Sequence, residues 1–154
     1  MNVVSPIKDK KQLELFKMYL REKSKRVFLM FMVGISSALR ISDILKLKVK
    51  DIWDGKKPKE YIYLNEKKTG KYKRFPIAEN LNKSIREYVK EYNPKEEDYL
   101  FCSSKGDKPI TRQHAAALIL SLAFDFVGIK EPISTHSMRK TWDIGHIKVE
   151  FHLL

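Results

Sequence analysis

The chain has 154 residues, 43% of them apolar, which suits one globular domain with its own core. Its 31 Lys and Arg against 19 Asp and Glu leave a net charge of +12, so a polyanion is the expected partner. The apolar run Val27–Ile35 is too short to span a membrane, and the N-terminus has no signal-peptide pattern, so we expect a cytoplasmic protein with no membrane partner. The single cysteine, Cys102, excludes an internal disulfide and a zinc site built from thiolates.

The first part of the chain predicts three helices. Residues 9–21 carry apolar side chains at helical spacing, namely Leu13, Phe16 and Leu20. Residues 27–35 are apolar on all sides, which predicts a buried helix. Ser42 can cap a short third helix that runs to Leu47.

The middle of the chain predicts a small β-hairpin. Residues 61–64 are rich in β-forming side chains, and the glycine within residues 68–71 suits a turn. Residues 74–77 can return as a short edge strand, since Pro76 is excluded from a central one.

Helical spacing then returns in two segments. The first covers residues 81–92 and stops before Pro94. The second covers residues 115–126, with Thr111 as its cap and Gly128 at its end.

The last predicted helix begins at Ser134 or Thr135. It would carry His136 and Arg139 on one face, because residues three apart lie side by side on a helix. The expected fold class is therefore mainly α with a small β-hairpin, an α+β arrangement.

Positive charge gathers between Lys46 and Pro76, where eleven Lys and Arg face four Asp and Glu, a net +7. Four aromatic residues are interleaved with these cations, namely Trp53, Tyr61, Tyr63 and Tyr72. Lysines that neutralise phosphates beside aromatic rings are typical of a nucleic-acid interface. A solvated lysine-rich surface is the alternative interpretation of the same pattern.

Three motifs stand in separate parts of the chain: Ala38-Leu-Arg-Ile-Ser-Asp-Ile-Leu45, Lys68-Thr-Gly-Lys-Tyr-Lys-Arg-Phe-Pro76 and Thr135-His-Ser-Met-Arg-Lys-Thr141. In this order, each on its expected element, they resemble the catalytic domain of the tyrosine recombinase or phage integrase family. The resemblance runs from about Ile7 to Thr141. It implies site-specific DNA recombination or integration, in which DNA is broken and rejoined through a 3′-phosphotyrosyl intermediate, and an origin in a bacterium, phage or mobile element.

The resemblance also implies roles for single residues. Arg40 and Arg139 would grip the non-bridging oxygens of the scissile phosphate, a task that suits planar, permanently charged guanidinium groups. Lys68 would protonate the departing 5′-oxygen, and His136 would contact the phosphate and act in acid–base catalysis. Asp43 would support Arg40 or the helix that carries it.

Around this site, Lys67, Lys71, Lys73 and Arg74 are the expected DNA-binding residues. We expect neither a cofactor nor a metal, because the arginines already supply positive charge and no spaced carboxylate or His/Cys cluster occurs. A sulfate or phosphate ion is expected between Arg40 and Arg139.

The family's nucleophile has no match in these residues. All seven tyrosines precede Arg139, so no tyrosine stands where the family places it. We therefore expect residues 1–142 to form a recombinase catalytic-like domain that is incomplete at its C-terminus, followed by an atypical tail over residues 143–154. The family's N-terminal core-binding domain is expected to be absent.

Three functions remain open at this point. The chain can be a recombinase domain that is inactive alone, needing self-association or a complete recombinase as partner. It can be a basic module that binds double-stranded DNA without catalysis. The third alternative is an unrelated RNA- or ribosome-associated protein.

Overall fold

The computed structural model describes residues 10–37, 39–65, 70–103, 108–127, 138–144 and 147–153. The helices are α1 (Lys10–Lys23), α2 (Lys25–Ser37), α3 (Ile41–Ile44), α4 (Val49–Ile52), α5 (Glu79–Tyr92) and α6 (Arg112–Val127). The strands are β1 (Tyr61–Asn65), β2 (Tyr72–Pro76), β3 (Met138–Ile144) and β4 (Ile147–Leu153). The described chain is thus mainly helical with two antiparallel hairpins, which confirms the α+β class and adds a hairpin that the sequence analysis does not predict.

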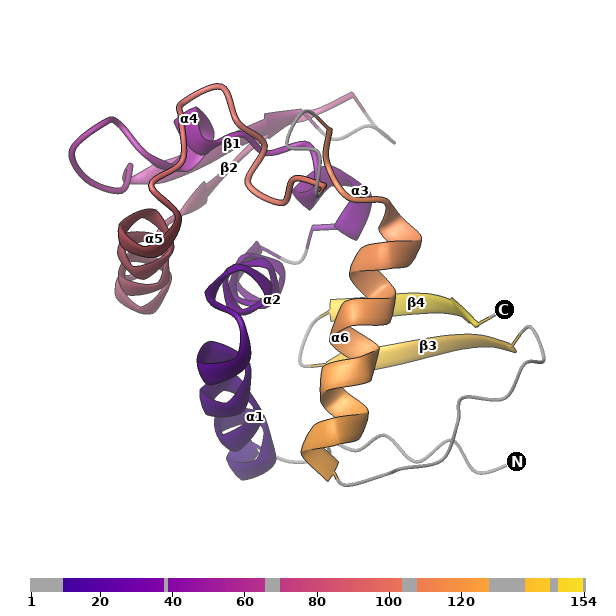
Figure 1. Ribbon diagram of the computed structural model, residues 1–154. Coiled ribbons are helices and arrows are strands. Elements are labelled where there is room, and N and C mark those ends of the chain that lie inside the picture. The colour runs from indigo at the N-terminus through magenta and orange to yellow at the C-terminus, as the bar shows by residue number, and fades with distance from the viewer. Residues whose placement is uncertain are drawn as a thin grey trace.

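Helix α2 lies at the centre of the helices because its residues are apolar on all sides. Figure 1 shows α1, α5 and α6 arranged around it. The ring of Phe16 on α1 lies 5.4 Å from Phe31 on α2 and 5.4 Å from Phe126 on α6, measured between centroids. Phe16 and Leu20 are fully buried, which confirms the apolar stripe predicted for residues 9–21.

An ion pair joins α1 to α5. Arg21 Nε donates a 2.9 Å hydrogen bond to Glu87, a second guanidinium N–H donates to the other carboxylate oxygen, and Lys25 Nζ lies 3.7 Å away. Burial raises the pKa of Glu87, but the hydrogen bond and charge of Arg21, with the charge of Lys25, outweigh burial and lower that pKa overall. Glu87 is therefore ionised at neutral pH and holds two cations of the first helices against α5.

Helix α5, predicted over residues 81–92, is also held through Tyr88. The Tyr88 hydroxyl donates a 2.8 Å hydrogen bond to the carbonyl of Leu100, and both residues are buried. Burial raises the pKa of Tyr88 well above its ordinary value, so the hydroxyl keeps its proton and remains a donor. This bond fixes the loop after α5 to the helix.

Replacing Tyr88 with Phe is expected to lower the free energy of unfolding by about 1–2 kcal/mol, because the Leu100 carbonyl would lose its donor inside the core. Denaturant titration measures the change. The matched control is Tyr92→Phe, where the side chain is 44% exposed on the same helix. Its effect should stay below about 0.5 kcal/mol. Equal losses in the two variants would contradict the role given to the Tyr88 hydroxyl.

The prediction that Ser42 caps the third helix is wrong. Arg40 is the N-cap residue, since its carbonyl accepts the N–H groups of Asp43 and Ile44 at 2.9 and 3.1 Å. Ser42 therefore lies inside α3, which ends at Ile44 instead of Leu47.

The end of α3 is followed by contacts with a distant segment. The N–H of Leu100 donates to the Leu47 carbonyl at 3.0 Å, and the N–H of Val49 donates to the Asp98 carbonyl at 2.9 Å. Because these bonds join parts of the chain far apart in sequence, local helical spacing does not reveal them. The second of these bonds lies at the first residue of α4, a short helix absent from the prediction.

The β1–β2 hairpin confirms the two predicted strands with small differences in their bounds: β1 extends to Asn65, and β2 ends at Pro76 instead of residue 77. Strand β2 begins at Tyr72, opposite Asn65, earlier than the predicted start at Arg74. Pro76 ends the strand in a two-stranded sheet, a position that proline tolerates. The face of β1 that turns toward the core holds Ile62 and Leu64.

Helix α6 confirms the helix predicted over residues 115–126, and the predicted cap is also correct. The Thr111 hydroxyl accepts a 3.1 Å hydrogen bond from the N–H of His114 in the first turn. The predicted end at Gly128 lies outside the described residues. In the part of the chain that the structure describes, no helix combines the length and the apolar character needed to cross a membrane.

The prediction of a last helix from Ser134 or Thr135 is wrong for the described part of that segment. Strands β3 and β4 pair antiparallel, with Arg139 opposite His152, and β4 lies against α6. The β3–β4 hairpin stands beside α6 in Figure 1. Most of the predicted atypical tail thus belongs to an added hairpin.

The sequence contains a signal for this hairpin. Apolar residues alternate with polar ones along β4, which is the period of a strand and not of a helix: Ile147, Val149, Phe151 and Leu153. Only Gly145 and His146 separate the two strands in sequence, and a glycine followed by one residue is typical of a tight hairpin connection.

Candidate nucleic-acid interface

Arg40 is an exposed cation on a fixed backbone. It precedes α3 in an extended conformation, with φ −69° and ψ 146°, and it follows the buried Leu39. Its carbonyl is held by two N–H groups of α3, so the main chain is anchored while the side chain reaches solvent. Among the described residues, the guanidinium makes no hydrogen bond or ion pair, which leaves it available for an anion.

Asp43 lies in the first turn of α3 and is only 4% exposed. Among the described residues, its Oδ1 has no hydrogen-bond partner, and Lys46 forms an ion pair with it, with Nζ 3.5 Å away. A carboxylate in the first turn is favourable because it faces the positive end of the helix dipole. Its expected support of Arg40 therefore stays a prediction.

The β1–β2 hairpin presents the exposed cations of the predicted interface. Lys71, Lys73 and Arg74 are all exposed on or beside β2. The guanidinium of Arg74 lies 4.8 Å from the ring centroid of Tyr61, an arrangement typical of a cation–π contact. Lys67 and Lys68, which are expected between the two strands, lie outside the described residues.

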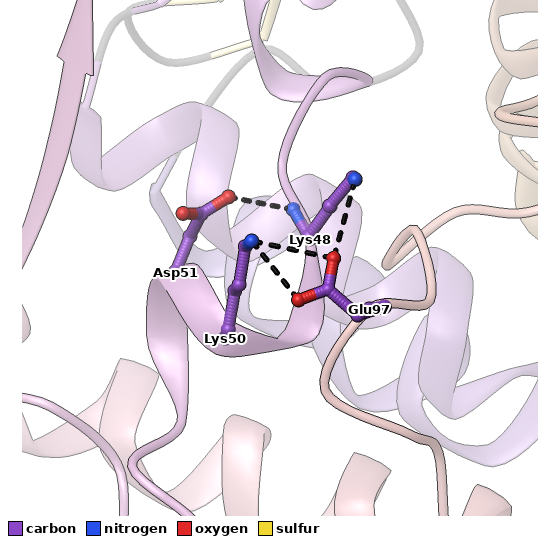
Figure 2. Close-up of polar contacts among 4 residues, drawn as sticks. All are labelled: Lys48, Lys50, Asp51 and Glu97. Atoms are coloured by element: carbon purple, nitrogen blue, oxygen red, sulfur yellow. Dashed lines mark hydrogen bonds and ion pairs between the residues drawn. The ribbon is translucent and has the colours of Figure 1, made fainter.

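Two lysines of the basic segment form ion pairs with the same distant acidic residue. Figure 2 shows Glu97 between them, with Lys48 Nζ at 3.6 Å and Lys50 Nζ at 3.0 Å. The hydrogen bond and charge of Lys50 lower the pKa of Glu97. The neighbouring Asp51 accepts a 2.7 Å hydrogen bond from the Lys48 N–H, which caps the N-terminus of α4. These lysines join the basic segment to the loop after α5, so counting charges along the sequence overstates what is free to meet a phosphate.

The remaining predicted site residues lie near the end of the chain. Arg139 is in β3, so the helical spacing that placed it beside His136 does not apply to it. His136 lies outside the described residues. The convergence of Arg40, Lys68, His136 and Arg139 on one phosphate stays a prediction.

Sequence reasoning missed Glu97 and the aromatic partner of Arg74. No local signal links Glu97 to lysines that lie almost fifty positions earlier, since the link depends on how the loop after α5 folds back. The Arg74–Tyr61 contact follows from the strand register, in which Tyr61 and Arg74 fall on one face of the hairpin.

Known sequences include a family model and two relatives that match this chain. The model of the phage integrase family matches residues 8–145. A Bacillus subtilis (strain 168) protein named "Probable integrase/recombinase YoeC" is 42% identical over 142 residues, which cover 92% of this chain and 74% of that protein. "Tyrosine recombinase XerC" of Staphylococcus epidermidis (strain RP62A) is 29% identical over 110 residues, which cover 70% of this chain and 35% of that protein.

Solved structures share the fold. XerA recombinase aligns with a TM-score of 0.61 at 17% identity, covering 82% of this chain and 45% of that one. The catalytic core of lambda integrase aligns with a TM-score of 0.55 at 18% identity, covering 80% of this chain and 72% of that one. These alignments confirm the expected catalytic-domain fold, and the chain spans less than half of XerA.

Proposed function

The chain belongs to the phage integrase family, and from this premise we propose that it takes part in site-specific recombination of double-stranded DNA. The observation that carries the proposal is the 42% identity to an integrase/recombinase over 92% of the chain. The exposed cations on the β1–β2 hairpin support it, because a DNA backbone is the polyanion that recombination requires. Because recombination of bacterial DNA takes place where that DNA lies, the proposed function would place the protein in the cytoplasm of a bacterial cell.

The proposed chemistry centres on Arg40. Its guanidinium, which has no partner among the described residues, would act with the guanidinium of Arg139 to hold the two non-bridging oxygens of the scissile phosphate. The two groups would stabilise the negative charge that develops there. Lys68 would give a proton to the departing 5′-oxygen, and His136 would act as an acid–base group beside the phosphate. Asp43 is proposed as a positioning residue, since its place in the first turn of α3 puts it close in sequence to Arg40.

The proposed partners are double-stranded DNA and further recombinase subunits. Lambda integrase has been solved as a tetramer bound to a Holliday junction and as a dimer bound to a core site. We propose that this chain likewise assembles with a second copy or with a complete recombinase on DNA. Residues 1–142 would form the catalytic-like part and residues 143–154 a separate tail, although β3 runs through that boundary.

The direct test of DNA binding is its dependence on salt. Fluorescence anisotropy measures the association constant for a duplex at several salt concentrations. The logarithm of this constant should fall with the logarithm of the salt concentration, with a slope of about −0.9 for each phosphate neutralised. Three contacts from the hairpin would give a slope of about −2.7 between roughly 50 and 200 mM salt. An acidic polypeptide of matched length serves as competitor control and should displace the DNA poorly. An affinity that stays constant over this range would contradict the proposed interface.

A second candidate function is DNA binding without catalysis. The specific observation in its favour is that all seven tyrosines precede Arg139, so these residues hold no nucleophile by the family's route. Membership of the phage integrase family excludes the alternative of an unrelated RNA- or ribosome-associated protein.

A further inference from the structure

A row of tyrosine rings covers the outer face of the β1–β2 hairpin. Tyr61 and Tyr63 alternate along β1 and lie on the face opposite the buried Ile62, with ring centroids 6.2 Å apart. Tyr72 on β2 continues the row, with its centroid 5.8 Å from that of Tyr63. The three rings therefore form one aromatic surface across both strands.

The outer end of this row is open and flat. The rings of Tyr63 and Tyr72 are stacked, with an angle of 22° between their planes. Tyr63 is 47% exposed and Tyr72 is 65% exposed, so solvent reaches both. Because the hairpin is held to the core through its other face, these rings are not needed to fill the interior. A planar, apolar group can lie against them.

Cations flank the other end of the row. The guanidinium of Arg74 lies 4.8 Å from the ring centroid of Tyr61. A shallow concavity of about 330 Å³ adjoins Tyr61 and Tyr63, and exposed Lys57 and Lys59 contribute to its lining. Asp54, also in the lining, already accepts two 2.8 Å hydrogen bonds from the N–H groups of residues 56 and 57. The lining also includes the exposed Glu60, so the two lysines are accompanied by carboxylates, and Arg74 is the cation that lies directly on the aromatic face.

We propose that this face binds nucleobases that are out of the double helix, as at a gap or a strand junction, by stacking them on Tyr63 and Tyr72. Arg74 and the lysines of the concavity would hold the adjoining phosphates. The inference rests on the proposed function and adds to it a preference for DNA with unpaired bases. A paired base exposes only its edges in the grooves, so stacking on a protein ring requires an unpaired one.

The test compares two DNA molecules of equal length, one an intact duplex and one with a central four-nucleotide single-stranded gap. The full chain should bind the gapped DNA about tenfold more tightly, as expected for about one stacked base. Replacing both Tyr63 and Tyr72 with Ala should remove this preference and leave the affinity for intact duplex within about twofold, since the phosphate contacts remain. A 2-aminopurine in the gap should lose fluorescence on binding the unmodified chain and keep it with the double variant.

Two further variants separate stacking from other causes. Tyr72→Phe keeps the ring and should keep the preference for gapped DNA. Tyr92→Ala removes a tyrosine of 44% exposure from α5, outside the row, and should change neither affinity.

Several results would overturn the proposal. A preference for the gap that survives the double Ala variant would come from the flexibility of gapped DNA. Loss of self-association in the double variant, seen by sedimentation with no change on either DNA, would assign the face to a second copy of the chain. Salt-sensitive binding without preference for the gap would overturn stacking alone, whereas no salt-sensitive binding to either DNA would also overturn the proposed function.

Discussion

Reversing Lys71, Lys73 and Arg74 to glutamate is expected to lower the affinity for duplex DNA by at least about 100-fold at roughly 100 mM salt. These three residues form an exposed cationic stretch at β2, so each can meet a phosphate. Each lost phosphate contact should also reduce the magnitude of the salt slope by about 0.9. The new carboxylates add repulsion toward the DNA phosphates. Anisotropy titrations at several salt concentrations measure both quantities.

A matched control separates the site from the overall charge. Reversing Lys83, Lys90 and Lys95, which are exposed on α5 and just after it, changes the net charge by the same amount. This variant should lose less than about tenfold in affinity, because its charges act at a distance and are screened by salt. Equal losses in the two variants would show that net charge, and not the hairpin, determines binding. Circular dichroism and thermal unfolding check that both variants are folded.

The second large effect concerns the covalent bond between protein and DNA, which either forms or does not form. A polypeptide of these 154 residues is expected to form no covalent bond with DNA, because none of its tyrosines follows Arg139. The family's reaction joins a tyrosine oxygen to the 3′-phosphate and releases the 5′-oxygen with a proton, so without that phenol the first bond is not made. Incubation with nicked and intact duplexes, followed by denaturing electrophoresis, would reveal any protein-linked DNA. An adduct formed by the chain alone would mean that another nucleophile acts, and the proposed site would be wrong.

The same assay decides between the two candidate functions when a full-length relative with an intact tyrosine is added. A recombinase domain that lacks only the nucleophile should support cleavage by the partner's tyrosine, and Arg40→Ala in this chain should abolish that support. A control mixture contains the relative with its own tyrosine changed to Phe and should give no adduct. If the chain binds DNA but never supports cleavage, the function is DNA binding without catalysis.

Much of the fold could be predicted from local patterns. The apolar stripe of α1, the uniformly apolar α2 and the helical spacing of α5 and α6 each bury their side chains against neighbours whatever the detailed arrangement. Strands β1 and β2 could also be predicted locally, because β-forming residues surround a glycine. For the site, the motif around Arg40 predicted a functional cation, and the structure places that residue in solvent on an anchored backbone.

Two errors arise within single elements, where one local signal is followed and another is missed. Ser42 has the right chemistry for a cap, but the carbonyl of Arg40 starts α3. The spacing of His136 and Arg139 predicts a helix from two residues only, whereas the alternation along β4 favours the hairpin that the structure has.

By itself, the sequence determined the family, the main helices, the first hairpin and the excess of positive charge, because each depends on residue types or on spacing within one element. Only the tertiary structure decided which cations of the basic segment are exposed at the hairpin and which pair with a distant acidic residue. Glu97 forms ion pairs with Lys48 and Lys50, whereas Lys71, Lys73 and Arg74 are exposed at β2. The strand register places Arg74 on the same face as the row of tyrosines. The physical reason is that a charge is neutralised by whatever lies within a few ångströms in space, and residues far apart in sequence become such neighbours only when the chain folds.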